Sequence, residues 1–184
     1  MSEDRLEQQE IVKLAAVAGA KAAMETLEKE RQRDRREMAD RRLRNTKLLL
    51  RNYRMFCAHV DHAVYEVEET ETAEEIIADL MMPGRDNALI VESIRKSAER
   101  TATIVRHMKT MMDLYQVYCH TMGTAEDERR WRVINALYIS DERRTIPQLA
   151  AEEGVVERTI YKDIDVASEK IAALMFGIDG MKRR

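Results

Sequence analysis

The hydrophobic positions of this chain recur every three or four residues over long stretches, which is the spacing of one face of an α-helix. Between residues 49 and 67 this stripe consists of Leu49, Tyr53, Phe56, Val60, Ala63 with Val64, and Val67. Between residues 90 and 122 it consists of Ile90, Ile94, Ala98, Thr101, Val105, Met108, Met112, Tyr115, Cys119 and Met122. We expect two long amphipathic helices that turn at Pro83-Gly84 and pack as an antiparallel hairpin.

Three short motifs predict where further helices begin. A Thr followed three residues later by Glu, Asp or Gln can form a capping box, in which two side chains satisfy free backbone amides. Thr72 with Glu75 opens a helix that runs through Leu80. Thr124 with Asp127 opens another after Gly123 ends the long helix, with Trp131, Ile134, Leu137 and Tyr138 as its apolar face.

The first 44 residues predict one more helix, because they contain no Pro and include the Ala-rich run LAAVAGAKAAM. Its apolar stripe is Val17, Ala20, Met24 and Leu27. Residues 28–37 contain no apolar residue to continue a heptad, so a long coiled coil is not indicated, whereas a short dimer contact stays open. The expected fold is all-α, with a charged helix at 1–44, a hairpin at 45–122 and a compact module at 124–180.

Composition agrees with a helical protein. The 184 residues are 35% charged and include only 2 Pro and 6 Gly, which argues against an all-β fold. The longest uncharged stretch near the start, residues 14–20, is far shorter than a membrane span, and we expect neither a signal peptide nor a membrane segment. Cys57 and Cys119 cannot form a disulfide framework, so the cytosol is the expected location.

Charge is unevenly distributed along the chain. Residues 29–54 hold eleven Lys or Arg and four acidic residues, whereas residues 61–79 hold eight acidic residues and no Lys or Arg. A net charge of -3 argues against coating nucleic acid over the whole surface, so any DNA contact must be local. The basic segment either follows phosphates or is a solvated helix with pairs such as Glu37 with Arg41. The acidic segment shields it, contacts a basic partner or is simply solvated.

Residues 145–174 have the spacing of a helix-turn-helix. Thr145 and Gln148 cap a short helix with Pro147 in its first turn, where a missing amide is harmless. Gly154 follows the small Ala150 by four residues and supplies a left-handed turn. The second helix then buries one stripe against the Trp131 helix, namely Ile160, Ile164, Ala167, Ile171 and Leu174.

The opposite face of this second helix is expected to be exposed and to meet DNA. It carries Arg158, Thr159, Tyr161, Lys162, Asp165 and Ser168. Arg158 can pair with guanine, Thr159 or Tyr161 can touch a thymine methyl group or a phosphate, and Lys162 suits a phosphate. The candidate DNA-binding residues are Thr145, Gln148, Glu157, Arg158, Thr159, Tyr161, Lys162 and Asp165.

The segment GVVERTIYKDID resembles the second half of the helix-turn-helix in DeoR-type regulators and in relatives of sigma-factor region 4. In those families the helix matched here by residues 157–162 enters the major groove of DNA. Their pattern usually has Ser or Thr where this chain has Val156. The whole layout, charged helices followed by a module ending in LMFGIDG, is similar to phage and prophage regulators of the ArpU and RinA kind. The resemblance implies a regulator of transcription that binds double-stranded DNA and contacts RNA polymerase, with a homodimer open.

Parts of the sequence also fit interpretations other than DNA binding. The helix pair also suits a plain structural hairpin or adaptor, or a DNA-packaging protein like a small terminase subunit, which would form a ring of many subunits. Cys57, His59, Asp61 and His62 are spaced as metal ligands can be, but they spread over more than one helix face, so no metal is expected. The methionines are assigned to the core rather than to an adaptable partner surface. No motif of an enzyme or cofactor site is present.

Overall fold

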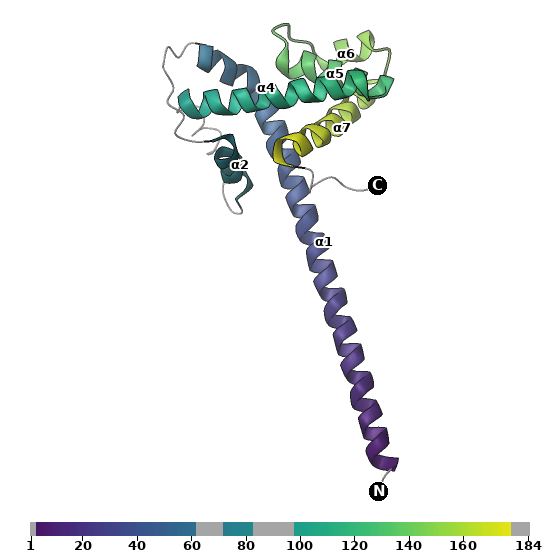
Figure 1. The fold of residues 1–184 in the computed structure, drawn as a ribbon. Helices are drawn as coiled ribbons and strands as arrows, with labels where there is room; N and C mark the ends of the chain where they lie inside the picture. Colours follow the sequence, from purple (N-terminus) through teal and green to yellow (C-terminus); the bar gives the residue numbers. More distant parts are fainter. Residues whose placement is uncertain (1–2, 62–71, 83–97, 178–184) are drawn as a thin grey trace. The chain divides into compact units, whose positions relative to one another are not determined.

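The protein is all-α, as the sequence predicts. The computed structural model describes residues 3–61, 72–82 and 98–177, and within these ranges every element is a helix and no strand occurs (Figure 1). The elements are α1 (Glu3–Asp61), α2 (Ala73–Met81), α4 (Ala98–Thr121), α5 (Ala125–Ile134), the π-helical turn η1 (Asn135–Ile139), α6 (Ile146–Glu152) and α7 (Glu157–Phe176). The Pro83-Gly84 turn and residues 90–97 lie outside the described residues, so the antiparallel hairpin stays a prediction.

The chain divides into two compact units, residues 1–38 and 39–184. In the first unit, α1 is helical as expected from its Ala-rich sequence, and every side chain from residue 13 to residue 38 is exposed. The exposure includes the apolar stripe, since Val17 is 64% exposed and Met24 is 68% exposed. The helix prediction is confirmed, and the short dimer contact stays a prediction.

The second unit contains the hydrophobic core. Its largest fully buried side chains are Leu49, Leu50, Phe56, Ile76, Leu80, Ile104, Met108, Tyr115, Ile134, Ile160 and Ile171. Tyr115 of α4 meets Trp131 of α5 edge to face, with ring centroids 6.1 Å apart, which is a favourable aromatic geometry. Met108 and Met112 are buried as predicted. Met122 is not, because α4 ends at Thr121 and leaves this side chain 79% exposed.

All three predicted capping boxes are present. Thr72 with Glu75, Thr124 with Asp127, and Thr145 with Gln148 each show both reciprocal hydrogen bonds at the start of a helix. Gly123, after α4, is required by close packing rather than by its backbone angles. A Cβ there would lie 2.5 Å from the carbonyl oxygen of Cys119. The chain therefore enters α5 through a turn that admits no larger residue without a shift.

Polar side chains of α1 bind the carboxyl-terminal ends of other helices in the second unit. Arg41 and Asn45 donate hydrogen bonds to the carbonyl oxygens of Met81 and Leu80, at 2.7 and 2.8 Å, where α2 ends. Arg42 donates to the carbonyl oxygen of Gly177 after α7. Donors placed there satisfy free carbonyls and oppose the negative end of the helix dipole. The two interpretations of the basic segment 29–54, phosphate binding and a solvated helix, did not include hydrogen bonds to the ends of other helices.

Arg54 binds the end of η1 in the same way. Its guanidinium donates to the carbonyl oxygens of Ser140, Leu137 and Ala136, at 2.7, 2.8 and 3.0 Å. The π-helical turn leaves these carbonyls without helical partners, so Arg54 fixes the segment that leads into α6.

Two further observations concern the described residues alone. Within residues 3–61, 72–82 and 98–177, none of the helices is both long enough and apolar enough to span a bilayer. The described side chains also contain no group of three or more His, Cys, Asp or Glu residues arranged to hold a metal ion. Cys57 is half-buried and His59 is exposed, while the side chains of Asp61 and His62 lie outside the description.

Candidate nucleic-acid interface

The turn between α6 and α7 has the geometry that the sequence predicts. Gly154 has a φ of +64°, a left-handed conformation that glycine adopts without steric cost. Its amide donates to the carbonyl oxygen of Ala151 at 3.3 Å, and the amide of Val155 donates to that of Ala150 at 2.9 Å. This pair of bonds is a Schellman motif, which ends α6 and turns the chain sharply into α7. Local hydrogen bonds thus fix the orientation of α7 relative to α6.

Apolar packing then holds α6 and α7 on the rest of the second unit. Leu149 and Ala150 of α6 and Ile160 of α7 are buried in the same cluster as Trp131 and Ile134 of α5. Helix α7 packs against α4, α5 and α6. Because one side of α7 is covered over most of its length, only the opposite side can meet a partner.

The structure brings most of the predicted site residues to that opposite side. Glu157, Arg158, Tyr161, Lys162 and Asp165 are exposed, and Thr159 is half-buried. Tyr161 exposes 54% of its surface, a large value for an aromatic side chain. The first two turns of α7 therefore present a guanidinium, a phenol and an ammonium group to solvent.

Three predicted site residues already have protein partners. Thr145 and Gln148 are exposed, but their side chains bond each other and the backbone in the capping box, with the Thr145 amide 2.8 Å from Gln148 Oε1. Asp165 forms an ion pair with Lys47 of α1, with Nζ and Oδ1 2.6 Å apart. These contacts hold the start of α6 and connect α7 to α1.

Two expectations about α7 are wrong. Ser168 was expected on the outer face, but it is fully buried. Leu174 was expected on the inner stripe, but it is 38% exposed, and Met175 is buried in its place. Both errors have one cause: α7 packs against α4 as well as α5, so its buried arc is wider than a single stripe and is turned from the predicted one.

Behind the exposed face, an ion network fastens α7 to α5. The side chain of Asp163 is 2% exposed and accepts hydrogen bonds from Arg129 Nε at 2.7 Å and from Arg130 Nε at 3.2 Å. Asp163 is not among the site residues predicted from the sequence. The available signal was its position three residues after Ile160 and four before Ala167, which places an acidic residue on the buried face of the helix.

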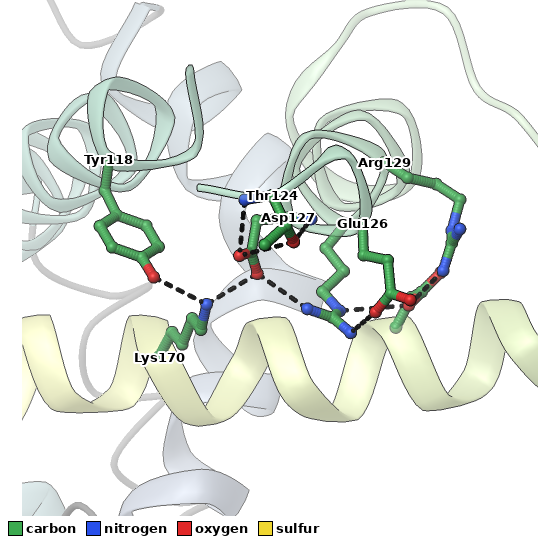
Figure 2. A network of polar contacts seen from close by, with 8 residues as sticks. Tyr118, Thr124, Glu126, Asp127, Arg129 and Lys170 are labelled. Atoms are coloured by element: carbon green, nitrogen blue, oxygen red, sulfur yellow. Dashed lines mark hydrogen bonds and ion pairs between the residues drawn. The ribbon is translucent and has the colours of Figure 1, made fainter. Parts of the chain in front are cut away.

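The network continues through Asp127 at the start of α5 (Figure 2). Its carboxylate accepts hydrogen bonds from Lys170 Nζ at 2.7 Å, from Arg130 Nη1 at 2.8 Å and from the Thr124 amide at 3.1 Å. Burial acts to raise the pKa of Asp127, but these hydrogen bonds outweigh it and hold the pKa well below its usual range. Asp127 is therefore ionised in the folded protein at neutral pH.

Lys170 of α7 also joins the network to α4. Its ammonium group lies 3.2 Å from the Tyr118 hydroxyl and 4.6 Å from the centre of the Tyr118 ring. Burial acts to lower the pKa of Lys170, and the hydrogen bonds with Asp127 and Tyr118 raise it further than burial lowers it. One charged network thus connects α4, α5 and α7 behind the exposed face.

A separate ion pair holds the end of α6. Arg132 of α5 donates two hydrogen bonds to the carboxylate of Glu153, at 2.8 and 2.7 Å. The hydrogen bond from Arg132 lowers the pKa of Glu153, against the opposing effect of burial. A two-point contact of this kind fixes orientation as well as distance. It braces the residue just before the Gly154 turn.

Comparison with known proteins returns no match: no protein-family model fits the chain, and no curated protein or solved structure is similar to it.

Proposed function

We propose that this protein binds double-stranded DNA in a sequence-specific manner and regulates transcription, with α7 as the helix that enters the major groove. One observation carries the proposal. Arg158, Tyr161 and Lys162 are exposed on one face of a helix whose opposite face is fixed by apolar packing and by the Asp163 ion pairs. A helix is 10–12 Å wide and the major groove is about 12 Å wide, so such a face can meet base edges.

The residues of this face suit different parts of the duplex. The Arg158 guanidinium can donate two hydrogen bonds to guanine, the pairing that most often specifies a base. Lys162, one turn further along α7, is a point charge suited to a phosphate. Tyr161 lies to one side of them on the same face and offers a ring and a hydroxyl. A rigid helix keeps these three groups in one register along the groove.

The first test is a selection of bound fragments from random duplexes, followed by titration of the selected site with Arg158→Ala. We expect the variant to lose about 1 to 3 kcal/mol of binding free energy on that site and to accept other bases at one position. The control is Glu169→Ala, an exposed change three turns further along α7. A binding curve and base preference unchanged by Arg158→Ala would remove Arg158 from the mechanism.

Lys162→Ala should behave differently, because a phosphate contact carries no sequence information. We expect weaker binding by a similar factor on all sequences, and a plot of log affinity against log salt that is shallower by about one unit. Titrations of the selected site and of a scrambled duplex at several salt concentrations measure both effects. A loss confined to the selected site would assign Lys162 to a base instead.

A further inference from the structure

Two exposed arginines lie outside the helix-turn-helix, one on α1 and one in the loop before α6. Arg51 is exposed on α1, and Arg143 is exposed in the loop just before α6. Arg54 lies three residues after Arg51 and binds the carbonyls at the start of the same loop, including that of Ser140. We call Arg51 and Arg143 the flanking arginines. Among the described residues, neither forms an ion pair or a hydrogen bond with a neighbour.

Contacts made by the neighbours of Arg51 on α1 show which parts of the second unit lie close to it. Arg42 of α1 binds the carbonyl oxygen of Gly177, and Lys47 binds Asp165. One turn beyond Lys47 on α1 is Arg51, and one turn before Asp165 on α7 is Tyr161. Arg51 thus shares a face of α1 with Lys47, which contacts Asp165 on α7, and with Arg54, which contacts Ser140 in the loop before α6.

Positive charge is concentrated at this place. Burial and then the nearby charge of Arg143 lower the pKa of Arg54, while Asp141 acts in the opposite direction. The Arg54 guanidinium is occupied by three carbonyl oxygens, which leave its charge uncancelled. Guanidinium groups that repel one another become favourable when an anion lies between them.

A helix in the major groove has a phosphate strand on either side of it. Side chains on an element next to that helix therefore meet phosphates, not bases. We propose that the flanking arginines bind the phosphate backbone of the strand that borders the groove entered by α7. This inference rests on the proposed function, and it extends the interface from the helix-turn-helix to α1 and to the loop before α6.

The test is the double substitution Arg51→Gln with Arg143→Gln, studied by titration of the selected duplex at several salt concentrations. Each lost phosphate contact reduces the salt dependence by about 0.9 units of slope, so we expect a slope shallower by about two units. The ranking of preferred sequences should stay unchanged. The matched control is Lys13→Gln with Lys21→Gln, which removes the same charge from two exposed residues of the first unit that lie outside the basic segment.

A slope that is unchanged, or that falls equally in the control, overturns the role of the flanking arginines. Arg51→Lys with Arg143→Lys keeps both charges and should keep the wild-type slope, and a slope that falls in this variant too would also count against phosphate contacts. Failure of the proposed function looks different, because the wild-type protein would then bind no duplex even at low salt. Circular dichroism of each variant confirms that the helices remain folded.

Discussion

Replacing Asp163 by Asn is expected to lower the free energy of unfolding by about 3 kcal/mol, because one carboxylate holds two arginines at a buried site. Asn keeps the shape of the side chain but not its charge. Arg129 and Arg130, which are only 20% and 14% exposed, would lose their shared anion and remain largely out of water. Removing one partner of a buried ion pair costs more than the pair itself contributes.

Urea denaturation followed by circular dichroism measures this change. Asp165→Asn is the matched control, since it alters the same residue type two positions further along α7, where the side chain is 60% exposed and paired with Lys47. Exposed ion pairs contribute little, so the control should lose less than about 1 kcal/mol. Equal losses in the two variants would show that burial of Asp163 does not determine its contribution.

Asp127 should make the stability of the protein sensitive to acid. Its pKa in the folded state lies below the value of an unfolded Asp, which is about 3.9. The resulting stabilisation is therefore fully present above about pH 4 and is lost progressively as the pH falls below that value. At pH 7, Asp127→Asn should lower the free energy of unfolding by about 2 to 3 kcal/mol, because Lys170 and Arg130 lose their carboxylate.

The deciding measurement is the difference in unfolding free energy between wild type and Asp127→Asn at pH 7 and at pH 3. We expect this difference to shrink at pH 3, where part of the wild-type stabilisation has already gone. Glu126→Gln is the control, because Glu126 also pairs with Arg130 but is 62% exposed. A difference that stays constant between the two pH values would contradict the assignment.

Much of the fold could be predicted because its signals are local. A capping box needs only residues three positions apart, and all three predicted boxes form. The Gly154 turn likewise depends on a glycine, a small residue before it and the hydrogen bonds of one Schellman motif. Helical periodicity also places Phe56, Met108 and Ile160 in the core, where the structure has them.

The errors come from features that depend on distant residues. A periodic stripe predicts the buried face of a helix that packs against one neighbour. Because α7 packs against more than one helix, this prediction was wrong for Ser168 and Leu174. The same periodic pattern placed Met122 on the buried stripe of α4, although α4 ends at Thr121. Asp163 and Arg129 are 34 positions apart in the sequence, so no local sequence pattern predicts that they form an ion pair.

The candidate site divides in the same way. The exposure of Arg158, Tyr161 and Lys162 follows from the period of α7 and was expected. The use of Arg54 as a cap for η1 was not, because it requires a π-helical turn whose free carbonyls lie more than 80 residues further along the chain. Sequence patterns thus predicted the face of α7, whereas the contacts that hold this face in place required the structure.

The contacts between α1 and the ends of later helices also affect how the chain folds during synthesis. Arg42 and Arg54 reach partners 135 and 82 to 86 residues later in the sequence. During synthesis, α1 leaves the ribosome before α7 does. The core around Leu49, Leu50 and Phe56 is therefore incomplete until these later residues have been made, and apolar surface exposed in the meantime favours aggregation.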